Sequence, residues 1–120
     1  MATAHNQIKA FLDSKGEPAV SAALRDAVAH TGALIPLGKE GFAGCLFSFD
    51  NDLDQQVTIT IQGKNFGDIA WHTAVAGAAV AAAAQGTSEV TAPWSELRIS
   101  YVAAGIPTTG TLYVGIQRRN

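Results

Sequence analysis

The sequence predicts a mainly β domain, a β-sandwich or barrel, with a helical segment at its N-terminus. From Gly41 onward, apolar residues alternate with polar ones, which is the period of a half-buried strand. Clusters of Gly, Pro, Asp and Asn separate these alternating stretches, as turns do between short strands. Before residue 36 the apolar residues recur at helical spacing instead. We therefore expect an N-terminal helical arm over residues 1–35 and a β-sandwich body over residues 41–120.

The composition is that of one small globular domain. The chain has 120 residues, of which 48% are hydrophobic, and its formal net charge is −2. It is long enough to bury a core and too apolar to be disordered. Only 15% of its residues are charged, and no basic block favours nucleic-acid binding. Few charges, with abundant Ala, Gly and Thr, favour surfaces that lie close against other proteins.

The arm is expected to contain a helix that enters at residues 14–18, where Pro18 suits the first turn. Five apolar residues then share one helical face: Val20, Ala23, Leu24, Ala27 and Val28. Gly32 is a plausible stop. A shorter apolar stripe precedes this helix and consists of Ile8, Phe11 and Leu12. Isolated helices of this length are marginal in water, so we expect the arm to pack on its own domain or on a neighbouring subunit.

Four stretches of the body are predicted as strands, at residues 45–49, 57–61, 97–101 and 112–116. The clearest is the second, in which Val57, Ile59 and Ile61 alternate with polar residues. Turns are expected at residues 50–55, 63–67 and 105–110. The last two strands, with a connection of six residues between them, are predicted to form a hairpin.

The alanine-rich stretch from Ile69 to Gln85 allows two structures. Alanine favours a helix, which Asp68 would cap and Gly86 would end. Gly77 inside it would cost such a helix roughly 1 kcal/mol. The alternative is a pair of strands lined with small side chains, where another layer approaches closely. We do not expect this stretch to span a membrane, because it is mostly alanine with polar residues inside. The chain also begins without the pattern of a signal peptide, so synthesis in the cytoplasm is expected.

Three carboxylates at alternate positions, Asp50, Asp52 and Asp54, are the only cluster that suggests a cation. Oxygen clusters of this kind bind calcium. An EF-hand is excluded, because Gln55 and Ile61 stand where that loop requires Gly and Glu. A looser cation site and a solvated turn both remain open.

No other motif predicts a metal, a cofactor or a reaction. The three histidines, at positions 5, 30 and 72, lack the spacing of a ligand pair, although Asp26 and His30 are spaced for a side-chain contact. A single cysteine, Cys45, excludes a disulfide framework and a cysteine zinc site, and we expect it to be buried. Nucleophile and phosphate-binding motifs are missing. We therefore expect a protein that is not an enzyme and needs no cofactor.

Two further groups of residues are candidates for contacts. Trp71 and Trp94 are candidates for stacking on sugar rings, although large aromatic residues are also ordinary core material. Arg118 and Arg119, at the C-terminus, are candidates for pairing with a partner's carboxylates, and a solvated tail is the alternative.

Two segments carry a family resemblance. Residues 47–63, FSFDNDLDQQVTITIQG, combine a strand, an Asp- and Asn-rich turn and an alternating strand that ends in glycine. Residues 92–101 (APWSELRISY) and 107–114 (PTTGTLYV) follow the second half of the same pattern. This pattern resembles that of small virion proteins of tailed bacteriophages. It covers the C-terminal two-thirds of the chain, and the N-terminal third has no counterpart.

The resemblance implies a jelly-roll-like sandwich and favours strands in the alanine-rich stretch. It also implies a non-enzymatic virion subunit, such as a head decoration or cement protein, a fibre or a tail-associated protein. Its partners would be its own copies and other virion proteins such as the major capsid protein, with no nucleic acid or membrane. We expect its contacts at Ile8, Phe11, Leu12, Arg118 and Arg119. The alternative is a glycan-binding sandwich that uses Trp71 and Trp94.

Overall fold

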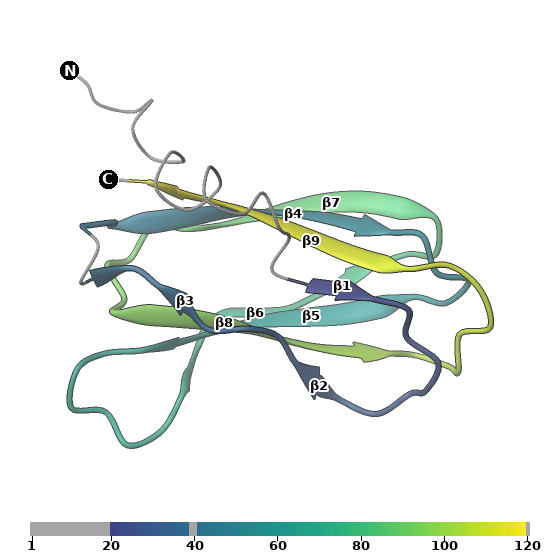
Figure 1. The fold of residues 1–120 in the computed structure, drawn as a ribbon, viewed down its shortest axis with the longest axis horizontal. Coiled ribbons are helices and arrows are strands. Elements are labelled where there is room, and N and C mark those ends of the chain that lie inside the picture. Colours follow the sequence, from purple (N-terminus) through teal and green to yellow (C-terminus); the bar gives the residue numbers. More distant parts are fainter. Residues whose placement is uncertain (1–19, 39–40, 120) are drawn as a thin grey trace.

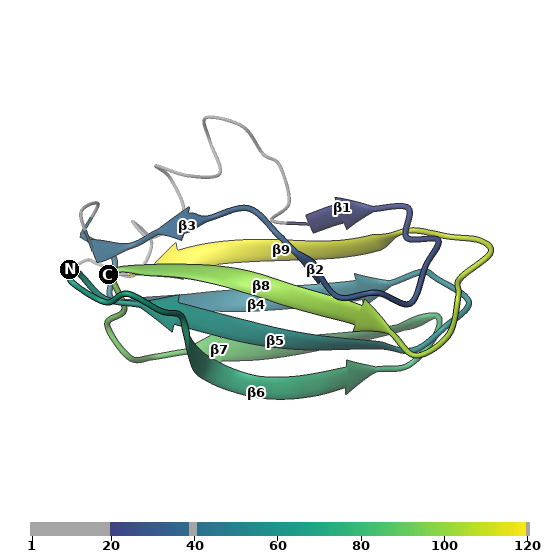
Figure 2. The same ribbon diagram turned by 90° about the horizontal axis from the view of Figure 1, so that it is seen from below.

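The computed structural model describes residues 20–38 and 41–119, which fold into two antiparallel sheets facing one another (Figures 1 and 2). Sheet I has the strand order β1 (Val20–Ala22), β9 (Leu112–Arg119), β4 (Gly44–Asn51) and β7 (Ala84–Val90). Sheet II has the order β2 (His30–Thr31), β8 (Glu96–Ala103), β5 (Val57–Lys64) and β6 (His72–Val80). A short β3 (Ile35–Pro36) also pairs with β8. The expectation of a mainly β sandwich is confirmed.

The chain alternates between the two sheets. It changes sheet at every connection between these strands except β2 to β3 and β5 to β6. This alternation, in two four-stranded antiparallel paths, is the arrangement of a jelly roll. Segments far apart in the sequence are brought side by side by it, for example β4 between β9 and β7.

The core lies between the sheets and is formed by the apolar residues that alternate with polar ones along each strand. Val57, Ile59 and Ile61 of β5 are buried, and so are Leu112, Val114 and Ile116 of β9, while their neighbours along the strands are less buried. Successive side chains of a strand point to opposite faces, so each strand contributes every second residue to the core. The four predicted strands of the body are all confirmed.

The helix expected across residues 18–32 is wrong for its described part. Residues 20–22 form β1, which pairs with β9, and residues 30–31 form β2, which pairs with β8. Val20 and Leu24 are buried, but Val28 of the same expected face is exposed. Pairing with long strands outweighs a weak helical pattern, because an isolated helix of this length is marginal.

The expected hairpin of the last two strands is also wrong. β8 lies in sheet II and pairs with β5, whereas β9 lies in sheet I and pairs with β4. The connection over residues 104–111 therefore crosses from one sheet to the other. Its turn residues reverse the chain in both arrangements, so local sequence does not distinguish them.

The alanine-rich stretch forms strands, as the resemblance implied, and the helix favoured by propensity does not form. β6 pairs with β5 and β7 pairs with β4. The pairing of β6 is irregular near Gly77, where an added Cβ would lie 2.9 Å from Thr58 Cγ2. A side chain at residue 77 would force Thr58 to shift, so this close approach favours glycine. Within the described residues, no helix has the length and apolar character needed to cross a membrane.

A buried asparagine ties together two connections at one end of the sandwich. Asn51 Nδ2 donates to the carbonyl oxygens of Gln55 and Val80 at 3.0 Å and of Ala81 at 3.1 Å. Its Oδ1 accepts the N–H of Leu53 at 3.1 Å. This contact bears out the expected Asp- and Asn-rich turn, in which side chains bond nearby backbone. Asn51 thereby holds the β4–β5 turn against the β6–β7 connection.

Candidate functional site

The β5–β6 loop, residues 65–71, presents two large apolar side chains to solvent. It projects beyond the sheets at the lower left of Figure 1. Phe66 is 70% exposed and Ile69 is 98% exposed. Single exposed apolar residues are ordinary, but two on one projecting loop form a candidate contact surface. We call this pair the apolar tip.

The loop that carries the apolar tip is braced at its base. Asn65 N–H donates to Asp68 Oδ2 at 2.8 Å, and Asp68 N–H donates to the Asn65 carbonyl at 3.1 Å. Phe66 N–H donates to Ser95 Oγ at 3.1 Å, and Ser95 N–H donates to Asn65 Oδ1 at 3.3 Å. Gly67 takes a φ of 88°, which favours glycine. A partner would therefore meet a loop that is already ordered, which lowers the entropic cost of binding.

Trp71, at the end of the same loop, lies against cationic side chains. The Arg98 guanidinium carbon is 4.3 Å from the centroid of the Trp71 ring, and Lys64 Nζ is 5.6 Å from it. Arg98 Nε also donates to Gln62 Oε1 at 2.7 Å, which holds the guanidinium in place. A sugar ring stacking on the face that Arg98 covers would have to displace this cation–π contact.

Trp94 covers the edge of the core. An added Cβ at Gly63 would lie 2.3 Å from Trp94 Cδ2, so the indole occupies the space above this glycine. The ring of His72 stacks on Trp94, with centroids 6.1 Å apart. Trp94 is half-buried and packs against the core cluster. Neither tryptophan therefore resembles an open stacking platform.

The residues expected to contact partners are placed as follows. Ile8, Phe11 and Leu12 lie outside the described residues. Arg118 is only 2% exposed; its Nη1 donates to the Pro36 carbonyl at 2.8 Å, and its guanidinium carbon lies 4.5 Å from the Phe42 ring centroid. This burial leaves Arg118 little surface with which to reach a partner. β9 includes Arg119, whose side chain is outside the described part.

The three carboxylates of the 50–54 stretch do not converge on a site. Asp54 accepts hydrogen bonds from the hydroxyl and the N–H of Thr108, and these bonds lower the pKa of Asp54 below its usual range. Within residues 20–38 and 41–119, no three His, Cys, Asp or Glu side chains group closely enough to hold a metal ion. Asp54 instead connects the β4–β5 turn to the β8–β9 connection.

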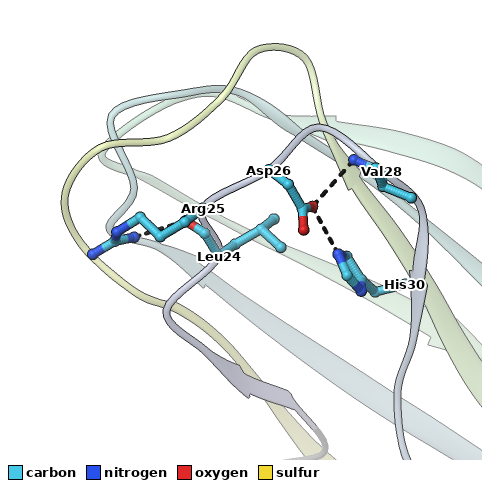
Figure 3. Close-up of polar contacts among 5 residues, drawn as sticks. All are labelled: Leu24, Arg25, Asp26, Val28 and His30. Carbon is cyan, nitrogen blue, oxygen red and sulfur yellow. Dashed lines mark hydrogen bonds and ion pairs between the residues drawn. The ribbon is translucent and has the colours of Figure 1, made fainter.

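Asp26 and His30 do make the side-chain contact that their spacing allows, but it joins the β1–β2 loop to the first residue of β2 rather than two turns of a helix. His30 Nε2 lies 2.8 Å from Asp26 Oδ1, which also accepts the Val28 N–H (Figure 3). The hydrogen bond with His30, and to a lesser extent that with the Val28 N–H, lowers the pKa of Asp26. The His30 ring stacks on Tyr101, whose pKa is raised mainly by burial. The cluster fixes the β1–β2 loop over β8.

Neither residue of the apolar tip was expected from the sequence. Both lie in or beside a stretch rich in Asn, Gly and Asp, which the sequence marks only as a turn. The signal that could have found them is the presence of large apolar residues within such a turn. Cys45, in contrast, is buried in the core as expected.

Comparisons with known proteins show the fold. No family model and no curated protein matches the sequence. Among solved structures, PBSX exported protein XepA matches with a TM-score of 0.69 and 19% identity, over 86% of this chain and 36% of XepA. PirA matches with a TM-score of 0.55 and 14% identity, over 83% of this chain and 92% of PirA. A carbohydrate-binding module, CBM28, specific for non-crystalline cellulose, matches with a TM-score of 0.50 and 10% identity, over 86% of this chain and 71% of the module.

These likenesses concern the chain fold, because the identities are too low to carry over a function. The chain spans about a third of XepA, 36% of its length, so XepA contains much that has no counterpart here. The described residues thus share their two-sheet β fold with proteins that include PBSX exported protein XepA and PirA.

Proposed function

We propose that this chain is a non-enzymatic structural subunit of a phage virion, of the decoration or cement type, which stabilises the particle through protein–protein contacts. The observation that carries the proposal is the apolar tip, Phe66 and Ile69 on a braced, projecting loop. Such a feature serves a protein that docks against another protein. Its partners are copies of this chain and other virion proteins such as the major capsid protein.

The energetic argument rests on covering the apolar tip. Fully burying a Phe or Ile side chain contributes about 1.5–3 kcal/mol. Because the loop is held by four hydrogen bonds that backbone N–H groups donate to oxygens of Asn65, Asp68 and Ser95, little of this gain is lost to ordering the loop. Binding to the assembled particle then stabilises both subunit and shell by mass action.

Two other observations support a phage protein. The segment over residues 47–63 resembles small phage virion proteins, and the two-sheet fold is shared with PBSX exported protein XepA. The low charge fraction of 15% also suits a surface that lies against other proteins. Localisation in the virion follows, after synthesis in the host cytoplasm.

The contact residues of this proposal differ from those expected at first. Phe66 and Ile69 take the place of Arg118, which lies inside the sandwich. Ile8, Phe11, Leu12 and Arg119 remain proposed contacts. A glycan site at Trp71 and Trp94 is not proposed, because Arg98 covers one ring and Gly63 and His72 pack on the other.

The test compares serine substitutions of two exposed isoleucines, one inside the apolar tip and one outside it. Ile69→Ser removes half of the apolar tip. Ile106→Ser removes an exposed isoleucine, 65% exposed, from the opposite end of the sandwich. Wild type, both single variants and the Phe66→Ser/Ile69→Ser double variant are studied by size-exclusion chromatography with light scattering. Each is then added to particles of the encoding phage assembled without this protein.

We expect wild type and Ile106→Ser to form a stable oligomer or to bind the particles. The double variant should bind roughly 100-fold more weakly, since a loss of about 3 kcal/mol corresponds to two factors of ten. Urea unfolding should be unchanged in all variants, because the substituted side chains face solvent. A monomeric wild type without affinity for the particles would refute the proposal, as would equal binding by the double variant.

A further inference from the structure

The outer face of sheet I carries a second surface, unrelated to the apolar tip. A depression of about 580 Å³ lies there, and it is open to solvent. Its lining side chains come from β4, β7 and β9, three adjacent strands. It is therefore built from the regular part of the sandwich rather than from loops.

Strand register arranges the outward residues of this depression in two rows. Directly paired residues of antiparallel strands point to the same face. The first row has long side chains, Tyr113, Asp50 and Gln85, and the second has short ones, Gly115, Ser48 and Thr87. A wall beside a low floor makes a groove that runs across the strands.

The groups in this groove combine one aromatic surface with uncharged or acidic polar groups. Tyr113 is 44% exposed and offers its ring at one end of the wall. Asp50 supplies carboxylate acceptors and Gln85 supplies both donors and acceptors, while Ser48 and Thr87 add hydroxyl groups. The lining contains no Lys or Arg, so phosphate, sulfate and nucleic acid are disfavoured by the Asp50 charge.

A peptide strand is a poor occupant, because the backbone at the groove is already paired. At Asp50 and Ser48, β4 is paired with β9 on one side and with β7 on the other. Strand addition requires a free edge, so a ligand here must be recognised by side chains. A molecule with many hydroxyl groups and an apolar C–H face satisfies both the polar groups and the aromatic ring.

We propose that this groove, walled by Tyr113, Asp50 and Gln85 above a floor of Gly115, Ser48 and Thr87, binds a neutral oligosaccharide. The site is distinct from Trp71 and Trp94, which lie with sheet II, and it does not depend on the proposed virion function. A sugar ring stacks on Tyr113, and its hydroxyl groups bond to Asp50 and Gln85.

The experiment uses variants that alter the groove and leave the core untouched. Gly115→Leu fills the floor, and no heavy atom lies within 4 Å of an added Cβ there. Tyr113→Ala removes the aromatic surface. Gln117→Leu is the matched control, because Gln117 lies on the same face of the same strand but does not line the depression. Each protein is applied to a printed array of neutral glycans, and the affinity for the strongest one is measured by calorimetry.

We expect wild type and Gln117→Leu to bind the same neutral glycans with affinities that salt does not change. Tyr113→Ala should weaken this binding by at least about tenfold, and Gly115→Leu should abolish it with an unchanged unfolding midpoint. Three outcomes would overturn the proposal: no glycan bound by wild type, equal binding by Gly115→Leu, or salt-sensitive capture of an oligolysine peptide instead. Loss of oligomers in Tyr113→Ala without any glycan binding would also overturn it, because it would assign this face to a protein contact.

Discussion

Replacing the buried Asn51 should destabilise the sandwich by an amount that its contacts determine. Its two amide N–H groups serve three carbonyls, and its oxygen accepts one N–H. With about 1 kcal/mol for each of three donated or accepted protons, Asn51→Ala should cost about 3 kcal/mol. The carbonyl groups and the N–H that lose their partner stay buried, and their desolvation penalty adds to the loss of stability.

Asn51→Asp keeps the shape but places a carboxylate against the carbonyls of Gln55, Val80 and Ala81, at 3.0 to 3.1 Å in the wild type. Burial and these oxygens disfavour the charged form, so the pKa of the new Asp should be raised in the folded state. The folded protein then holds a proton that the unfolded chain has lost. Stability therefore falls as pH rises above about 3.9, by at most about 1.4 kcal/mol per pH unit, until the folded pKa is reached.

The assay is urea unfolding followed by tryptophan fluorescence, at about pH 4 and about pH 7. Asn51→Ala should lose the same stability relative to wild type at both pH values, whereas Asn51→Asp should lose distinctly more at the higher one. Asp52→Ala, at the exposed neighbouring residue, is the control and should change little. A cost below about 1 kcal/mol for Asn51→Ala, or an Asn51→Asp cost independent of pH, would refute this reasoning.

Three further predictions concern packing and pH. Arg118→Ala should cost about 2–4 kcal/mol in urea unfolding, because it removes a buried side chain and its bond to a carbonyl oxygen; an unchanged midpoint would contradict this. Gly63→Ala should cost about 1–3 kcal/mol and shift tryptophan fluorescence, since the new Cβ would meet Trp94 at 2.3 Å; a silent variant would show that the indole is not held there. Asp54 has a lowered pKa in the folded state, so its contribution is present above pH 3.8 and is lost as pH falls through the lower folded value. Asp54→Asn should therefore be less sensitive to acid between these pH values than wild type, measured by unfolding midpoints across the acid range; an identical pH dependence would contradict the bond to Thr108.

The alternation of apolar and polar residues was sufficient to predict the long strands. In β5, the apolar residues Val57, Ile59 and Ile61 are all buried, as their alternation with polar residues predicts. Sheet membership could not be predicted in this way, because a turn such as residues 105–110 is compatible with a hairpin and with a crossing between sheets. The N-terminal prediction failed for a related reason: β1 and β2 are three and two residues long, too short for any period to be visible.

The candidate contacts were harder to predict than the strands. Arg118 shares the parity of Leu112, Val114 and Ile116, which places it inside the sandwich, but its charge and position suggested a contact with a partner or a solvated tail. Its long side chain reaches the Pro36 carbonyl, a contact between segments far apart in sequence. The outward direction of Tyr113 follows from the alternation in β9. The groove beside it does not, because it depends on which strands flank β4.

The most direct test of the virion proposal is a cryo-electron microscopy map of purified virions of the encoding phage. The proposal predicts copies of this sandwich at regular positions on the particle, with Phe66 and Ile69 buried against a neighbouring subunit. Virions that lack the protein, or copies whose β5–β6 loop points into solvent, would contradict it.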